Sequence, residues 1–144
     1  MIIENPRAAM LSNFEVLQLL EEQQAKQKKA QDSTNGISVP ENLRTVQFEL
    51  AEYLKETSCG TQDQKQVKEF MEAMKSYELT MAEKLQLLNL RPRSAVEIYL
   101  LIEECEERFS EDQLEEMLET VLSALPRDDD ELMEEEYDEE QQQD

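Results

Sequence analysis

The sequence predicts an all-α protein. Its 144 residues include only two glycines and four prolines, and residues with high helix propensity such as Leu, Glu, Gln, Lys and Met dominate. Apolar residues recur at helical spacing along most of the chain. A Ser or Thr followed three residues later by Glu or Gln, the pattern of a capping box, occurs at several places where such a stretch begins. The length allows one small domain with appendages.

The first helix is expected to begin at Ser12, because Glu15 stands in capping-box register to it. Its apolar side, formed by Phe14, Leu17 and Leu20, lasts only about three turns, and the sequence is polar from there to Gln31. Residues 32–42 gather Asp, Ser, Asn, Gly and Pro, which is typical of a linker. Residues 1–31 therefore form a detached N-terminal segment.

Five further helices are predicted over residues 43–126, which are enough to bury one modest core. The first of them carries Leu43, Val46, Leu50, Tyr53 and Leu54 at helical offsets. We expect it to end at Gly60 in the left-handed conformation, and the next helix to begin at Thr61. The other three begin at capping boxes: Thr80–Glu83, Ser94–Glu97 and Ser110–Gln113. The helix from Ser94 to Phe109 has the broadest apolar arc and is predicted to be the most buried.

Acidic residues outnumber basic ones by 35 to 14, which gives a formal net charge of -21. Residues 127–144 alone hold 11 acids and one base, so this tail is expected to be disordered. The remaining body is also acidic and would repel a phosphate backbone, so little or no direct nucleic-acid binding is expected. The sequence contains no apolar run of about 18 residues, so no transmembrane helix is predicted. The opening MIIENPRAAM lacks the pattern of a signal peptide.

The usual equipment of an enzyme is missing, so no catalytic residue, cofactor or metal is predicted. The chain has no histidine, and its glycines stand apart, which excludes a phosphate-cradling loop. A calcium loop starting at Asp128 fails, because Leu132 and Met133 occupy positions that require a ligand and a glycine. The acids at 103–107 are typical of a solvated helix face. Both cysteines are expected to be reduced, and Cys105 lies in an apolar stripe, as a core thiol does.

Two segments are candidates for binding a partner. The first helix, with the short apolar stretch Ile2–Ile3 ahead of it, needs a surface to cover its apolar face. Residue chemistry favours the body of this chain and another protein equally as that surface. The second candidate is the segment 82–92, AEKLQLLNLRP, whose polar residues could form an interaction ridge. By their chemistry alone, these residues are more typical of helix capping and turn formation than of partner binding.

The runs LSNFEVL (11–17), LTMAEKLQLLNLRPRSAVEIYLLIEECEERF (79–109) and the EDQLEEMLETVLSAL that follows resemble one family. It is the family of small helical stalk subunits of RNA polymerases, which includes the fourth subunit of RNA polymerase II and its archaeal counterpart. The runs look like the RNA polymerase III member of this family, which in animals is also called calcitonin gene-related peptide receptor component. The acidic tail lies outside the resemblance.

This resemblance implies an HRDC-like helical domain, here residues 43–126. It also implies that an N-terminal strand and helix dock on a larger stalk subunit with an OB-fold, which would make the RNA contacts. By position, the docking residues are Ile2, Ile3, Leu11, Phe14 and Leu17. A second contact falls on Glu83, Lys84, Leu87, Asn89 and Arg91.

The function implied is that of a non-catalytic RNA polymerase III subunit. Its stalk heterodimer would support initiation at tRNA and 5S rRNA genes through contacts with the polymerase core and initiation factors. The nucleus is the expected location, with the cytoplasm as a further one. Two alternatives remain open: an acidic chaperone-like protein that acts through its tail, and a receptor-accessory protein.

Overall fold

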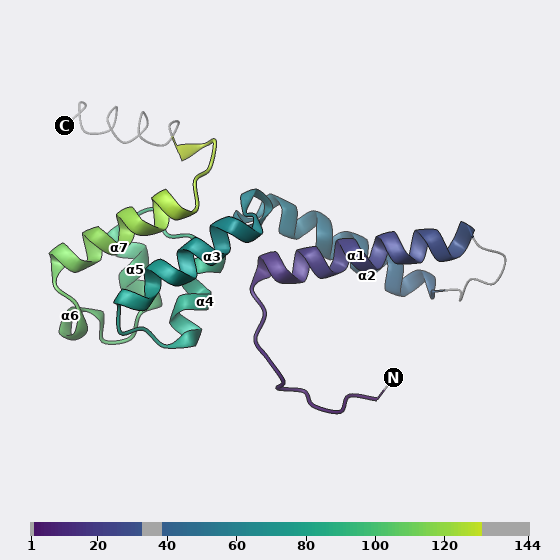
Figure 1. Cartoon of the computed structure of the whole chain (residues 1–144), viewed down its shortest axis with the longest axis horizontal. Helices are drawn as coiled ribbons and strands as arrows, with labels where there is room; N and C mark the ends of the chain where they lie inside the picture. The colour runs from purple at the N-terminus through teal and green to yellow at the C-terminus, as the bar shows by residue number, and fades with distance from the viewer. Residues whose placement is uncertain (1, 33–38, 131–144) are drawn as a thin grey trace. The chain divides into compact units, whose positions relative to one another are not determined.

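The computed structural model describes residues 2–32 and 39–130 (Figure 1). All regular structure in these ranges is helical, which confirms the predicted fold class. The elements are α1 (Asn13–Asp32), α2 (Glu41–Glu56), the 3-10 turn η1 (Ser58–Thr61), α3 (Gln64–Ala73), the 3-10 turn η2 (Met74–Ser76), α4 (Met81–Leu90), α5 (Ala95–Leu101), α6 (Cys105–Arg108) and α7 (Glu111–Ala124). Residues 131–144 of the tail predicted to be disordered, and most of the linker, lie outside the described residues.

The contacts divide the chain into two compact units. The first comprises the chain up to Gln62 together with Leu88–Leu90, and the second comprises Asp63–Leu87 and the chain from Arg91 on. The prediction grouped α2 with the later helices, in a body that starts at residue 43. In the structure, α2 instead packs against α1.

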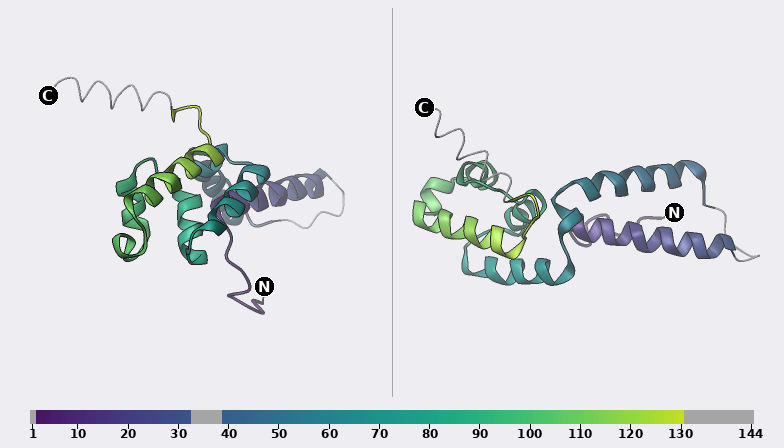
Figure 2. Two further views of the ribbon diagram at one scale, coloured as in Figure 1. Left: turned by 60° about the vertical axis from the view of Figure 1, so that its left-hand side comes forward. Right: turned by 90° about the horizontal axis from the view of Figure 1, so that it is seen from above.

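The first unit is an antiparallel pair of helices, α1 and α2, closed at one end by η1 (Figures 1 and 2). Its core consists of Leu17, Leu20, Ala51, Leu54 and Cys59, with Phe14 and Val16 packed against it. Further along the pair the contact between α1 and α2 is polar: Gln47 Nε2 donates to Gln23 Oε1 at 3.4 Å. The apolar contact therefore occupies only the end of the pair near η1.

Gly60 does not take the left-handed conformation expected of it, because no described glycine has a positive φ. It lies within η1, where a Cβ atom would come within 2.0 Å of the carbonyl oxygen of Lys55. Close approach of two backbone segments therefore requires the glycine. Since η1 occupies Ser58–Thr61, the next helix starts later than expected, with Asp63 rather than Thr61 as its N-cap.

The second unit surrounds a core contributed by α3, η2, α4, α5 and α7. Its fully buried side chains include Phe70, Met74, Leu87, Ile98, Leu114, Met117 and Val121. Helix α7 packs against both α3 and α5. At one edge the rings of Tyr77 and Phe109 meet edge-on, with centroids 6.5 Å apart.

The predicted capping boxes at Thr80–Glu83, Ser94–Glu97 and Ser110–Gln113 are confirmed. The long helix predicted from Ser94 to Phe109 is wrong, because α5 ends at Leu101 and α6 begins at Cys105. Between them Glu104 has a φ of 51°, in the left-handed region, which interrupts the helix. The break keeps Ile98, Ile102, Cys105 and Phe109 buried. No helix in the described ranges is long and apolar enough to cross a bilayer.

Candidate partner-binding surfaces

The residues predicted for N-terminal docking have different environments in the first unit. Ile2, Ile3 and Leu11 are exposed, and no strand forms over residues 2–11. Phe14 is half-buried against the core of this unit, and Leu17 belongs to that core. The first helix thus uses part of its apolar face inside the chain. The exposed isoleucines and Leu11 remain available to another molecule.

Helix α1 starts as the sequence indicated. Ser12 Oγ accepts from the backbone N–H of Glu15, and the Glu15 carboxylate accepts from the N–H of Ser12, both at 3.2 Å. The backbone N–H of Asn13 donates to Asn89 Oδ1 at 2.8 Å within the same unit. This bond fixes the entry of the chain into α1, and it occupies the acceptor atom of Asn89.

Helix α2 presents an apolar surface that we call the α2 stripe: Leu43, Val46, Leu50 and Tyr53. These residues recur at helical spacing on one face, and they are 38 to 64% exposed. The face turned toward α1 carries Gln47, Ala51 and Leu54 instead. The spacing of these residues predicts a helix of the body, and their exposure is a feature of the folded chain that the spacing does not indicate. A contiguous apolar patch of this kind is typical of an interaction site.

Two of the predicted second-contact residues in the second unit are occupied by bonds or packing within the chain. The carboxylate of Glu83 accepts from the backbone N–H of Thr80 in the capping box of α4. It also accepts from the guanidinium of Arg108 at 2.7 and 3.0 Å. Because Arg108 donates to it, the pKa of Glu83 is lowered to about 2, against the opposing effect of burial. Leu87 is fully buried in the core. Lys84 is half-buried and forms no ion pair with a described residue.

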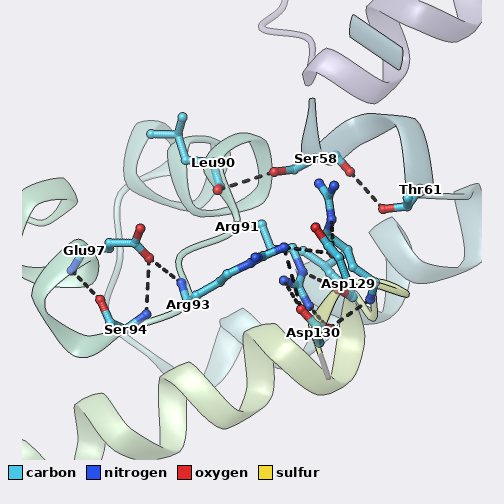
Figure 3. A network of polar contacts seen from close by, with 11 residues as sticks. Ser58, Thr61, Leu90, Arg91, Arg93, Ser94, Glu97, Asp129 and Asp130 are labelled. Carbon is cyan, nitrogen blue, oxygen red and sulfur yellow. Dashed lines mark hydrogen bonds and ion pairs between the residues drawn. The ribbon is translucent and has the colours of Figure 1, made fainter. Parts of the chain in front are cut away.

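Arg91 is also bonded within the chain, in the network drawn in Figure 3. Its side chain is 1% exposed, and its guanidinium donates to both carboxylate oxygens of Asp130, at 2.9 and 2.6 Å. It also donates to the carbonyl oxygen of Leu125, at the end of α7. Arg93 pairs with Asp129 at 2.9 Å. The first acids of the predicted tail therefore belong to the folded unit.

These ion pairs change the acidity of the two aspartates. Hydrogen bonding from Arg93 lowers the pKa of Asp129, with burial opposing the change. For Asp130, burial raises the pKa, but the hydrogen bonds from Arg91 and the N–H of Arg127 outweigh it, and the net pKa is lowered. Both carboxylates remain charged well below neutral pH. The contact between α4, α7 and the start of the tail is thus electrostatic over the physiological range.

The described residues offer no arrangement typical of catalysis. Within 2–32 and 39–130 no three potential metal ligands come together. Cys59 and Cys105 are free and buried. Burial raises the pKa of the Cys105 thiol, which disfavours the reactive thiolate.

Comparison with known proteins gives a consistent result. Residues 10–124 match the family described as RNA polymerase Rpb4. The chain is 36% identical over 124 residues to DNA-directed RNA polymerase III subunit rpc9 of Schizosaccharomyces pombe, a match that covers 83% of this chain and 95% of the relative.

Two further relatives carry the same description. Identity to the RNA polymerase III subunit rpc9 of Dictyostelium discoideum is 29% over 141 residues, covering 91% of this chain and 98% of that protein. Identity to subunit RPC9 of Saccharomyces cerevisiae is 45% over 53 residues, covering 37% of this chain and 33% of that one.

Proposed function

Because the chain belongs to the RNA polymerase Rpb4 family, we propose that it is a non-catalytic subunit of RNA polymerase III. It pairs with a larger OB-fold subunit to form the stalk of that enzyme. The heterodimer associates with the polymerase core and supports initiation at tRNA and 5S rRNA genes through contacts with initiation factors. Its place of action is the nucleus, and nothing in the comparisons supports a cytoplasmic location.

The observation that carries this proposal is the apolar surface of the first unit. Val46 and Tyr53 of the α2 stripe are 59 and 64% exposed, although both are large apolar side chains. Exposed apolar surface on this scale costs solvation free energy of about 25 cal/mol per Å2. A partner subunit that covers the stripe recovers this free energy, so the first unit is built to be completed by another chain.

The N-terminal residues extend the same argument. Ile2, Ile3, Met10 and Leu11 precede α1 and are all exposed. An extended segment with these side chains can pair with the edge of a sheet in the larger subunit through its backbone groups. The strand expected at residues 2 and 3 is therefore proposed to form only in the complex.

The net charge of the chain supports the proposed division of roles within the heterodimer. The chain carries a net charge of -21, and phosphate backbones are repelled by such a protein. The OB-fold subunit is therefore the one that contacts RNA, and the present chain acts through protein contacts. The receptor-accessory alternative has no structural feature in its favour.

Substitution of the α2 stripe tests the pairing. Val46→Asp with Tyr53→Asp places two charges in the proposed interface, and we expect the co-expressed OB-fold subunit to be lost in affinity purification. Neither side chain packs in the core of the first unit, so circular dichroism should show unchanged helix content. Substituting Leu17, by contrast, would damage that core and confuse the two effects.

A matched control is available on the same helix. Thr45→Asp with Phe48→Asp adds the same two charges to exposed positions off the stripe and should leave pairing intact. If the stripe variant still copurifies with the OB-fold subunit as well as the control does, this docking surface is refuted.

A further inference from the structure

The segment that contains α5 and α6, in the second unit, combines exposed apolar side chains with acidic ones. Val96 and Leu100 stand one helical turn apart on α5 and are 67 and 80% exposed. Ile98, on the other side of the helix, is fully buried. The core therefore does not explain why Val96 and Leu100 are apolar.

A surface cavity of about 370 Å3 opens beside this helix. Its walls are formed by Tyr99, Ile102, Glu104, Cys105, Glu106 and Glu107. It spans the break between α5 and α6, where Glu104 adopts the left-handed conformation, and it is lined by Tyr99 of α5 and by the acids of α6. Ile102 and Cys105 are buried and provide an apolar floor, while three carboxylates stand at the rim.

The charge of this rim is not neutralised locally. In the described part of the chain, Glu104, Glu106 and Glu107 form no ion pair. Arg108, which follows Glu107 in the sequence, donates instead to Glu83 and to the backbone oxygens of Glu78 and Glu103. The hydrogen bonds to Glu83, opposed by burial, raise the pKa of Arg108, and the charge of Glu104 acts in the same direction as Glu83. Burial and then the charges nearby, including that of Glu106, raise the pKa of Tyr99.

We propose that the α5–α6 surface is a docking site for an amphipathic helical segment of another protein, one whose apolar side chains are flanked by Lys or Arg. Charge complementarity selects this occupant. Helix α5 carries the two exposed apolar side chains and, through Tyr99, also lines the cavity with its three unpaired carboxylates. Apolar anchors cover Val96 and Leu100, and a basic side chain enters the cavity toward the rim. Nucleic acid is repelled by the same carboxylates.

This site is separate from the α2 stripe and lies in the other unit, so it does not depend on the stalk pairing proposed above. The probe for a test is a synthetic helical peptide of about 15 residues, composed of Leu at helical spacing and Lys elsewhere. The full-length chain, labelled with nitrogen-15, is titrated with this peptide. We expect saturable shifts of the amide signals of residues 95–108. Shifts confined to the acidic tail or to α2 would overturn the proposal.

Two variants separate specific docking from general attraction to an acidic protein. Leu100→Ala leaves the charge unchanged and should weaken binding at this site about tenfold, since a buried leucine contributes strongly to association. Met81→Ala removes another exposed apolar side chain, on α4, and should change the affinity less than about twofold.

Glu106→Gln with Glu107→Gln removes two rim charges and should weaken binding about fivefold. The control, Glu115→Gln with Glu119→Gln, removes two charges from exposed positions of α7, and so has the same net charge. If both pairs of substitutions weaken the peptide equally, only overall charge attracts it, and the docking site does not exist.

Discussion

At the scale of single residues, Glu83 connects local and distant parts of the second unit. Its carboxylate accepts a hydrogen bond from the backbone N–H of Thr80, the N-cap of α4, and it also accepts one from the guanidinium of Arg108 in α6. The capping role was evident from the sequence, because it depends on residues three positions apart. The ion pair joins positions 25 residues apart, and only the folded chain brings them together.

The ion pair of Glu83 predicts a pH-dependent stability. Since the folded pKa is about 2 and the ordinary value is 4.5, the unfolded chain binds the proton first as the pH falls. The stabilisation is thus complete above about pH 4.5 and is lost as the pH approaches 2. Glu83→Gln keeps the cap but removes the charge, and should lower the free energy of unfolding by about 2 kcal/mol at pH 7.

Urea unfolding of both proteins at several pH values measures this difference. The gap between wild type and Glu83→Gln should narrow as the pH falls from 4.5 toward 2. A gap that stays constant over this range would show that the charge of Glu83 does not stabilise the fold.

Gly60 is required by space rather than by backbone conformation. In Gly60→Ala, the new methyl group would meet the Lys55 carbonyl, so α2 and η1 must move apart. We expect the first unit to lose about 2 kcal/mol of stability, as an overpacked site does. Hydrogen exchange at the amides of α1 and α2 reports this loss. Thr61→Ala, at the exposed neighbouring position, serves as the control and should have little effect.

At the scale of elements, the junction of α5 and α6 shows how a single residue divides a helix. Glu104 adopts the left-handed region, which costs a residue with a side chain about 1 kcal/mol relative to glycine. Glu104→Gly should therefore stabilise the second unit by about that amount. Glu107→Gly, three residues further on within α6, should destabilise it instead. Thermal unfolding of the two variants distinguishes them, and equal effects of the same sign would contradict the role of Glu104.

The two faces of α2 show a different kind of limit. The apolar side chains at Leu43, Val46, Leu50 and Tyr53 have helical spacing, and their pattern alone places them in a core. In the structure, the face that packs carries Ala51 and Leu54, because a small alanine lets α1 approach closely. Which face of α2 becomes buried depends on the surface of the element that packs against it. The residue pattern of α2 alone contains no information about that surface.

At the scale of the whole molecule, the acidic tail begins later than its composition indicates. Asp129 and Asp130 carry the charge typical of the tail, yet they form ion pairs with Arg93 and Arg91 of the second unit. Asp129→Ala with Asp130→Ala should lower the free energy of unfolding by about 3 kcal/mol, because it leaves the buried charge of Arg91 without a carboxylate partner. Urea unfolding measures this change.

Removal of residues 131–144 is the matched comparison. It takes away most of the tail charge but leaves both ion pairs, so stability should change by less than about 0.5 kcal/mol. If the truncation lowered the free energy of unfolding as much as the double substitution does, the ion pairs of Asp129 and Asp130 would not explain the effect of that substitution.

The same truncation separates the function proposed here from that of an acidic chaperone-like protein. Affinity purification of the truncated chain should still recover RNA polymerase III if the chain acts as a stalk subunit. Loss of the main partner on truncation would favour a protein that acts through its tail.

The all-α class, the starts of α1, α4, α5 and α7 and the lack of histidine can all be read from the amino-acid sequence. These features depend on propensity, on capping pairs three residues apart and on composition, all of which are local. The packing of α2 on α1, the exposure of the α2 stripe, and the ion pairs of Glu83 and Arg91 within the chain became evident only in the folded protein. Burial and ion pairing depend on which distant segments meet in space, and a pattern of neighbouring residues does not contain that information.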